Sequence, residues 1–308
     1  MKRFFIKLYN FASSWTGTII IVFAIIFFVA QAFIIPSASM QNSLLIGDFL
    51  FAKKFSYGVA IPRIPLSNTP VFPDIFNNGH IIEGEKPQRG DIVIFLNPLN
   101  DKENFVKRCF AVGGDEVIYK DDAFYLHHNE GDEYIKKNYP ADEITEISGK
   151  LWVKNPYVEI YPGINYGLDA NTMMNMIAWE NNPWHRGRRI AMDKISTNEL
   201  EPFDYALRRI SIPYPNPYNE NEIRTVIVDI PNFNAFYVKI PQDEFFMIGD
   251  NRDNSQDSRF FGSIPYKLII GKPWFIYFSW DSNKVPRWDR IGKFVSTLEK
   301  TEHKNIRY

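Results

Sequence analysis

The sequence predicts a mainly β protein: an antiparallel, barrel-like β domain with an inserted second β-rich lobe, preceded by one N-terminal transmembrane helix. Three observations support this fold class. A long apolar stretch comes first, several short β-type runs end in turn signals, and little else in the chain has a helical pattern. With 308 residues, of which 45% are hydrophobic and 16% aromatic, the chain has ample material for a folded core.

The N-terminal stretch, residues 16–35, is almost entirely apolar and as long as a bilayer-spanning helix, about 20 residues. Lys2, Arg3 and Lys7 precede it, and no acidic residue occurs before Asp48. We therefore expect residues 1–14 in the cytoplasm, a transmembrane anchor over residues 15–35, and the rest of the chain outside.

A cleaved secretory signal is the alternative, because Ala30-Gln31-Ala32 has the small-x-small form of a cleavage site. The apolar run, however, exceeds the ~7–15 residues of a signal-peptide core and continues through Ile35. This favours an uncleaved anchor. The hypothesis that explains why Ala30–Ala32 escapes cleavage is that these residues stay helical within the bilayer.

The β-type runs that follow define the main β domain, expected over residues 36–126 and 240–282. They lie at 48–52, 91–95, 105–112, 115–126 (a hairpin), 244–248 and 274–278. Between the first two, residues 57–86 are rich in proline and predict an irregular excursion, which contacts either the membrane surface or the domain.

The composition of the sequence changes at residue 127: prolines, tyrosines and charged residues become frequent, and few segments show a regular hydrophobic pattern. Residues 127–239 are therefore expected to form the inserted lobe, with one short helix at 171–180, and residues 283–308 a C-terminal tail. The net charge of −1 gives no indication of a nucleic-acid partner, and a single cysteine, Cys109, excludes an intramolecular disulfide.

A lysine and a serine carry the chemical signal. Lys107 interrupts an apolar run in which Phe105, Lys107, Cys109 and Ala111 would share one face of a strand. A lysine in apolar surroundings loses its proton readily and can act as a base at neutral pH. Ser39, flanked by small residues after Pro36, is the hydroxyl that such a base could activate. The pair predicts a hydrolase, unless the lysine merely extends to water.

Other catalytic arrangements find little support. The sequence has neither a Gly-x-Ser-x-Gly nor a Ser-x-x-Lys motif, and no histidine has an acidic partner placed as in a triad. His127 and His128, beside Glu130, are the one metal candidate, but neighbouring strand residues point to opposite faces. We expect no metal and no cofactor.

Five sequence blocks, taken in order, resemble the bacterial type I signal peptidase family. They are Ile35-Pro36-Ser37-Ala38-Ser39-Met40, Leu44–Asp48, Arg89–Phe95, Val106-Lys107-Arg108 with Gly113-Gly114-Asp115, and Gly249–Arg259 with Gly262. The inserted lobe carries no motif of the family. One departure is visible: Asn42-Ser43 stands where family members commonly have Pro-Thr, so Ser43 is an alternative, weaker candidate nucleophile.

The resemblance implies a Ser/Lys dyad in which Ser39 is the nucleophile and neutral Lys107 the general base. Ser255 would orient the lysine amine, and the Ser37 hydroxyl with the Ser39 N–H would form the oxyanion hole. The supporting ion pairs would be Asp257 with Arg259 and Asp250 with Arg108, and the substrate-pocket walls Ile35, Pro36, Met40 and Val106.

The implied activity is removal of signal peptides from exported precursor proteins, after small residues of the Ala-x-Ala type. It would take place at the outer face of the bacterial plasma membrane, by a monomer that contacts precursors and the lipid bilayer. Two rival functions remain: a Ser/Lys self-cleaving protease of the repressor type, and a membrane-tethered binding or scaffold protein without enzymatic activity.

Overall fold

The structure is a computed structural model. It describes residues 2–24, 30–41, 43–64, 69–120, 123–165, 193–195, 207–216, 219–231 and 235–301. The helix expected at 171–180 and Asn42 lie outside the described residues.

The larger sheet carries the candidate site. Within the described residues it has seven strands, and each pairs with its neighbours in antiparallel fashion. In spatial order they are β1 (Ala30–Ile34), β2 (Asp48–Lys53), β17 (Ile269–Ser279), β5 (Ile92–Asn97), β6 (Asn100–Val112), β15 (Glu244–Ile248) and β16 (Ile264–Pro265). The mainly β, antiparallel prediction is confirmed.

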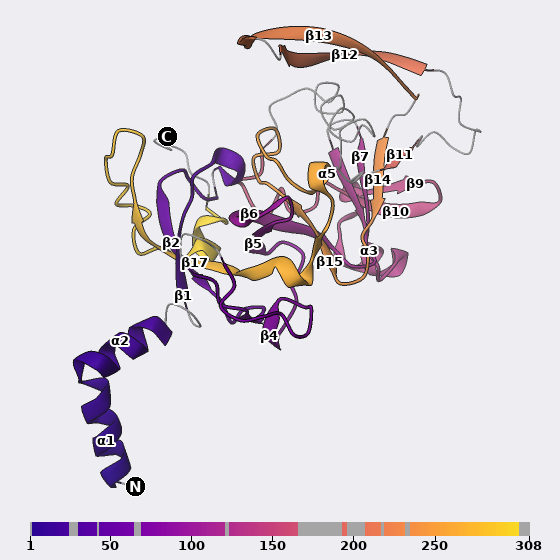
Figure 1. Cartoon of the computed structure of the whole chain (residues 1–308). Coiled ribbons are helices and arrows are strands. Elements are labelled where there is room, and N and C mark those ends of the chain that lie inside the picture. The colour runs from indigo at the N-terminus through magenta and orange to yellow at the C-terminus, as the bar shows by residue number, and fades with distance from the viewer. Residues whose placement is uncertain are drawn as a thin grey trace.

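A second sheet lies beside the first (Figure 1) and joins it directly after β6. Its six described strands, in spatial order, are β11 (Asp193–Ile195), β14 (Ala235–Lys239), β7 (Glu116–Lys120), β8 (Ala123–His127), β10 (Lys150–Lys154) and β9 (Ile144–Ile147). The predicted 115–126 hairpin is confirmed as β7–β8, but it belongs to this second sheet. The chain therefore changes sheet near residue 114, earlier than the expected boundary at 126.

The remaining described elements are short or separate. Two further hairpins are β3 (Gly58–Ala60) with β4 (His80–Glu83), and β12 (Leu207–Asn216) with β13 (Asn219–Pro231), which Figure 1 shows apart from both sheets. The helices and 3₁₀ turns are η2 (Ala38–Met40), α3 (Asp132–Asn138), η3 (Ala141–Glu143), α5 (Ser258–Phe261), η4 (Tyr266–Leu268) and α6 (Val295–Leu298).

One core cluster joins the two sheets. Phe110 and Phe246 from the first sheet pack with Tyr119, Phe124 and Phe236 from the second, and all five side chains are fully buried. Aromatic rings remove a large apolar area from water, so this cluster fixes one sheet against the other. This cluster includes Phe110 of β6, so it also holds in place the strand that carries Lys107.

A β-bulge in β6 corrects the predicted face of this strand. Opposite β15, Cys109 pairs with Met247 and Ala111 with Phe246, so Phe110 is the extra residue. Phe105 and Cys109 face one core cluster as predicted, but Ala111 packs in the other, and Val112 continues the face of Cys109. The simple alternation that placed Ala111 beside Lys107 is therefore wrong.

The N-terminal segment forms two helices, α1 (Lys2–Ala12) and α2 (Trp15–Ala24), which project away from the sheets (Figure 1). Among the described residues, no helix combines the length and apolar character that crossing a bilayer requires.

The predicted helix over residues 15–35 is wrong in its last part. Ala30–Ile34 form strand β1, which pairs with β2 from Ala30 opposite Lys53 to Ile34 opposite Phe49. Pairing with β2 satisfies the backbone groups along one side of this segment, and Ile35, just beyond its end, is buried. The hypothesis that Ala30-Gln31-Ala32 stay helical in the bilayer is therefore also wrong.

The segment expected as a C-terminal tail packs against the main sheet over its described part. Val295 and Leu298 of α6 are buried in the cluster that contains Leu50 and Ile276. These apolar residues lie at helical spacing, but the mixed composition of the segment around them gave no clear helical pattern. They are enough to hold the segment against the sheet.

Candidate active site

Ser39 lies in the short turn η2, between β1 and β2. The turn is held from the Gly249–Arg259 segment: the Asn251 N–H donates to the Ser39 carbonyl (3.1 Å), and the Asn251 side-chain amide donates to the Ala38 carbonyl (3.2 Å). The first N–H groups of a helical turn have no acceptor within it, so the Ser39 N–H stays available to a ligand.

Lys107 contacts Ser39 from strand β6. On β6 it lies opposite Val93 of β5, and its Nζ donates a hydrogen bond to Ser39 Oγ at 2.5 Å. Only 4% of Lys107 is exposed. Burial lowers the pKa of its amine to about 8; Asp257 opposes this shift and Arg259 adds to it. The two residues singled out by the sequence are thus in contact, and the lowered pKa makes the neutral form of the lysine far more accessible near physiological pH than that of an ordinary lysine.

Two buried ion pairs hold the segments around this contact. Arg108 donates to both carboxylate oxygens of Asp250 at 2.8 Å, and Arg259 donates to Asp257 at 2.8 and 2.9 Å. Burial alone would raise the pKa of each carboxyl, but the arginine partner outweighs it and leaves both pKa values below their ordinary range. Both pairs therefore remain charged and fixed in geometry.

The Asp257–Arg259 pair also shapes the turn beside the lysine. The Asp257 carboxylate caps α5 and accepts the Gly249 N–H at 3.1 Å. A β-carbon on Gly249 would lie 2.2 Å from Ser255 Oγ and 2.5 Å from the Ser39 carbonyl oxygen, so only glycine fits. The Gly249–Arg259 segment and the serine turn are therefore in close contact at Gly249.

The other predicted hydroxyls lie close to the dyad. Ser37 is exposed, and its Oγ lies 3.4 Å from Ser39 Oγ. Ser255 is buried beside Gly249, but no hydrogen bond joins its hydroxyl to Lys107 in this structure. Ser43, the alternative nucleophile, is fully buried and donates to Asp250 at 2.5 Å, which gives it a structural contact away from Lys107.

A groove of about 950 Å³ runs past Ser39 and Lys107. Its walls include all four predicted pocket residues, Ile35, Pro36, Met40 and Val106. Sequence reasoning missed the others that matter most for shape: Phe51 and Phe105, which add aromatic walls, and Gln31–Ile34 of β1, which forms one rim. The lining of the groove is mainly apolar.

The C-terminal segment supplies buried charges that the sequence analysis missed. Arg290 donates to the Asp48 carboxylate (2.7 Å) and to the Ser43 carbonyl (3.0 Å), and Glu299 accepts from Arg108 at 2.8 Å. These contacts hold the chain that follows the serine turn and the arginine next to Lys107. Spacing alone could not reveal them, because the partners are about 190 to 250 residues apart.

His127 and His128, the candidate metal ligands, have separate surroundings. The Nδ1 atom of His127 lies 2.8 Å from the Leu151 carbonyl oxygen, whereas His128 packs between Tyr134 and Tyr139. Over the described part of the chain, no group of three or more His, Cys, Asp or Glu side chains could hold a metal ion.

Comparison with known proteins decides the family. A family model described as signal peptidase, peptidase S26, matches residues 8–280. This chain belongs to the signal peptidase family. As a signal peptidase it is a serine endopeptidase that removes signal peptides, so the resemblance predicted from the five sequence blocks is confirmed.

Two signal peptidase I sequences agree with this assignment. The signal peptidase I of Helicobacter pylori is 44% identical over 315 residues, which cover 97% of each chain. That of Buchnera aphidicola subsp. Baizongia pistaciae is 31% identical over 274 residues, covering 86% of this chain and 75% of the relative. The crystal structure of a signal peptidase I from Enterococcus faecalis matches with a TM-score of 0.24 and 19% identity, covering 61% of this chain and 97% of that chain.

Lys107 destabilises the fold that contains it. Its pKa falls from 10.5 to about 8 on burial, so below pH 8 the folded chain carries a charge that burial disfavours. We expect Lys107→Met to raise the free energy of unfolding at pH 7 by up to about 3 kcal/mol. The gain should shrink between pH 8 and about 10.5, where only the unfolded state still binds the proton. Denaturant unfolding at pH 7 and pH 10 measures this, and an equal or lower stability at pH 7 would contradict it.

The clamp formed by Glu299 can be tested separately. Glu299→Gln removes the charge that faces buried Arg108, and we expect the free energy of unfolding to fall by about 1–3 kcal/mol. Glu133→Gln is the matched control, because Glu133 is exposed on α3 and pairs only with exposed Lys136 among the ion pairs described. Denaturant unfolding should show no change for the control. Equal midpoints for both variants would count against the clamp.

Proposed function

We propose that Ser39 and Lys107 form the catalytic dyad with which this chain removes signal peptides from secretory precursors. The observation that carries the proposal is the 2.5 Å hydrogen bond between a buried lysine amine and a serine hydroxyl at the groove floor. Serine is a weak nucleophile until a base takes its proton, and a pKa of about 8 suits that base at neutral pH.

In the acylation step, Ser39 Oγ attacks the carbonyl carbon of the scissile peptide bond while neutral Lys107 takes the hydroxyl proton. The negative charge that develops on the carbonyl oxygen is stabilised by the Ser39 N–H and the Ser37 hydroxyl, which lies on the same side as the nucleophile. Lys107, now an ammonium, gives its proton to the leaving amine of the mature protein. An acyl-enzyme ester at Ser39 remains.

Deacylation repeats these roles with water as the nucleophile. Neutral Lys107 takes a proton from the water, whose oxygen attacks the ester carbon, and then returns a proton to Ser39 Oγ as the signal-peptide carboxylate leaves. Each chain carries both members of the dyad, so a monomer suffices. Ser255 lies beside Gly249, where rotation of its hydroxyl during the reaction would let it orient the lysine, and Asp257–Arg259 and Asp250–Arg108 hold the scaffold.

The groove selects small side chains next to the cut. Ile35 and Met40 are buried residues that line the groove beside Ser39, and Val106 adds a branched side chain, so we expect these walls to disfavour a large residue. An extended substrate with Ala at the first and third positions before the cut would direct both side chains to the same wall, because strand side chains alternate.

We propose that the apolar N-terminal segment before residue 30 attaches the chain to the plasma membrane. Arg3 and Lys7 precede this segment, so the N-terminus would be cytoplasmic and both sheets would lie on the outer face, where exported precursors emerge. β1 then leads directly from the membrane to the serine turn. The two rival functions have no comparable support.

The dyad can be tested by substitution. With a precursor whose signal peptide ends in Ala-x-Ala, Ser39→Ala and Lys107→Ala should each lower kcat at least about a thousandfold, because nucleophile and base act as one unit. Lys102→Ala, an exposed lysine on the same strand, is the matched control and should leave the rate unchanged. Residual cleavage above a tenth of the unsubstituted rate in either dyad variant would refute the assignment.

The pH dependence reports the lysine. Below its pKa of about 8 the amine holds a proton and cannot act as base, so kcat/KM should rise with pH and be about fifty-fold lower at pH 6 than at pH 8. Asp257 raises the lysine pKa, so Asp257→Asn should move the rising limb to lower pH, whereas Glu133→Gln should not. A flat profile from pH 6 to 9, or a limb that moves upward in Asp257→Asn, would argue against Lys107 as the base.

A further inference from the structure

One stretch of the inserted lobe, residues 155–165, leaves the second sheet and packs against the candidate active site. It follows β10, and its first residue is fixed to β8. The Asn155 N–H donates to the Phe124 carbonyl at 2.7 Å, and the Asn155 side-chain oxygen accepts the Phe124 N–H at 2.8 Å. From there the segment makes three contacts with β6 and with the Gly249–Arg259 segment. It therefore links the inserted lobe to the residues that hold the proposed dyad.

The first contact is made by Tyr157 at the β-bulge of β6. Its hydroxyl donates to the carbonyl of Phe110, the bulged residue, at 3.0 Å, and the two rings meet edge to face with centroids 5.7 Å apart. Tyr157 has a φ of 82°, a backbone conformation that a bulky side chain rarely adopts. Such strain persists only where the surroundings hold it, so the segment is firmly fixed at this point.

The second contact is made by Tyr161 with Arg108, the residue next to Lys107. The Tyr161 ring lies over the guanidinium, with its centroid 3.7 Å from the Arg108 Cζ atom. A guanidinium is planar and donates its hydrogen bonds within its plane, as Arg108 does to Asp250. The ring holds the face that these hydrogen bonds leave open, through a cation–π contact. Tyr161 therefore fixes the arginine in the direction in which its ion pair does not.

The third contact joins the segment to the serine turn through a single residue. Asn165 and Asn251 form a short parallel β-bridge. The Asn165 N–H donates to the carbonyl of Asp250, and the Asn165 carbonyl accepts the N–H of Arg252, both at 3.0 Å. The Asn251 N–H donates in turn to the Ser39 carbonyl at 3.1 Å. Asn251 is therefore the middle of three backbone segments, with the inserted lobe on one side and the proposed nucleophile on the other.

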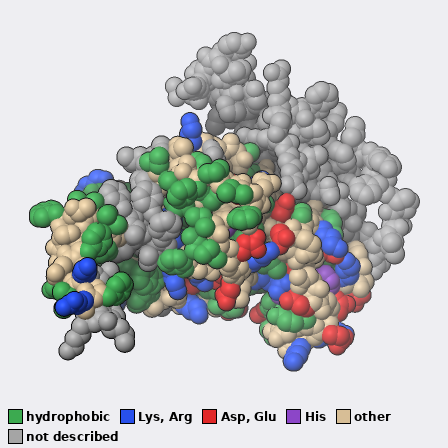
Figure 2. Space-filling model, turned by 60° about the horizontal axis from the view of Figure 1, so that its bottom comes forward, with side chains coloured by type: hydrophobic (Ala, Val, Ile, Leu, Met, Phe, Trp, Pro, Cys, Tyr) green, Lys and Arg blue, Asp and Glu red, His purple; other side chains and the backbone are tan. Residues whose placement is uncertain are grey.

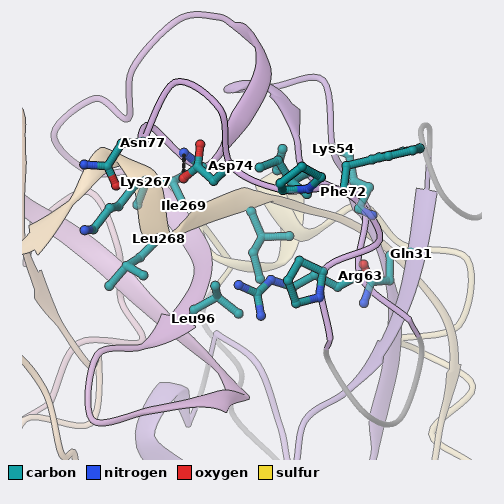
Figure 3. Close-up of a pocket in the computed structure, with 16 residues that line it drawn as sticks. Gln31, Lys54, Arg63, Phe72, Asp74, Asn77, Leu96, Lys267, Leu268 and Ile269 are labelled. Atoms are coloured by element: carbon teal, nitrogen blue, oxygen red, sulfur yellow. Dashed lines mark hydrogen bonds between the residues drawn. The ribbon is translucent and has the colours of Figure 1, made fainter.

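Residues 155–165, all of which the structure describes, line neither the groove nor the pocket that borders it. That pocket, of about 290 Å³, shares Gln31 with the groove, and Figure 3 shows Lys54 and Arg63 around it. The segment thus contacts the residues that hold the proposed dyad and leaves free the walls open to a substrate. A change in this segment should therefore alter the rate of the chemical step and leave substrate binding the same.

We propose that residues 155–165 are a positioning element for catalysis, in which Tyr161 fixes Arg108 and Asn165 fixes Asn251, so that the serine turn keeps its place against β6. The inference rests on the proposed Ser39–Lys107 dyad. It gives the inserted lobe, which carries no motif of the family, a role in the reaction. Reacting groups must be held closely, since a displacement of about 1 Å can lower a rate about a hundredfold.

The kinetic test uses the full-length chain in detergent and a precursor whose signal peptide ends in Ala-x-Ala. Tyr161→Leu removes the ring over the Arg108 guanidinium, and we expect kcat to fall about tenfold while KM stays within about twofold. Tyr161→Phe keeps the ring and should retain at least about half of the unsubstituted kcat. An equal loss in both variants, or a change in KM alone, would overturn the proposal.

Helix α3 of the same lobe supplies the matched control. Figure 2 shows charged side chains gathered over the part of the molecule where Figure 1 places α3, and Glu133, Lys136 and Lys137 are exposed there. Tyr134 of this helix is half-buried, as Tyr161 is, but its ring packs on His128, which has no part in the proposed site. Tyr134→Leu should leave kcat unchanged. Equal kcat values for Tyr134→Leu and Tyr161→Leu would contradict the positioning role.

Hydrogen exchange at single-residue resolution tests the link itself, and it can be measured on the unsubstituted chain even if a variant does not fold. The Asn165 and Arg252 amides bond across the two segments, so they should open together and exchange at rates within about tenfold of each other, after correction for sequence. In Tyr161→Leu the Asn251 amide, which bonds to Ser39, should exchange at least about fivefold faster than in Tyr134→Leu. Independent opening of the two segments, or equal Asn251 rates in the two variants, would refute the link.

The two proposals can fail separately. Hydrogen exchange uses no substrate and can be measured in the Ser39→Ala background, so a failed dyad assignment leaves it unaffected. If Ser39→Ala still cleaved the precursor while Tyr161→Leu was slow, the dyad assignment alone would be wrong. If Ser39→Ala was inactive and Tyr161→Leu cleaved at the unsubstituted rate, the positioning role alone would be wrong.

Discussion

The rest of the main domain depends on one contact, between the Lys107 amine and the Ser39 hydroxyl. Burial lowers the pKa of this amine to about 8, and burial is possible because β6 lies between β5 and β15 and is backed by the second sheet. Burying an amine lowers the stability of the fold, and the lowered pKa that results is useful only for the proposed chemistry. The two sheets, their shared aromatic core and the ion pairs supply the stability that offsets this loss.

The ion pairs show how a serine on a turn is made rigid. Ser39 lies outside any long element, so its position depends on neighbours from distant sequence. Asn251 holds the carbonyls of the turn, Arg290 holds the chain just after it, and Arg108 links Asp250 to Glu299. Three separate parts of the chain thus meet around Ser39, the proposed nucleophile, and loss of one partner would leave a buried charge unmatched.

The sequence was informative where local chemistry determines structure. The strand runs and the turn signals were sufficient to predict β5 and β6. The odd placement of Lys107 in an apolar strand pointed to a base, and the resemblance to the signal peptidase family implied its contact with Ser39. Prediction failed where tertiary pairing overrode local character. Ala30–Ile34 are apolar enough for a membrane helix, yet pairing with β2 makes them a strand, and the bulge at Phe110 cannot be read from alternation. Glu299 and Arg290 were missed because isolated charges in a mixed segment carry no signal without their partners.

Strand β1 has one consequence for how substrates are measured. Its register with β2 is fixed over five residue pairs, and Ser39 follows its last residue by five positions. With the proposed membrane attachment, the strand would set a constant distance between the apolar segment and Ser39. The position at which a precursor is cut would then depend on that distance, so the spacing between a signal's apolar core and its small residues would become part of recognition.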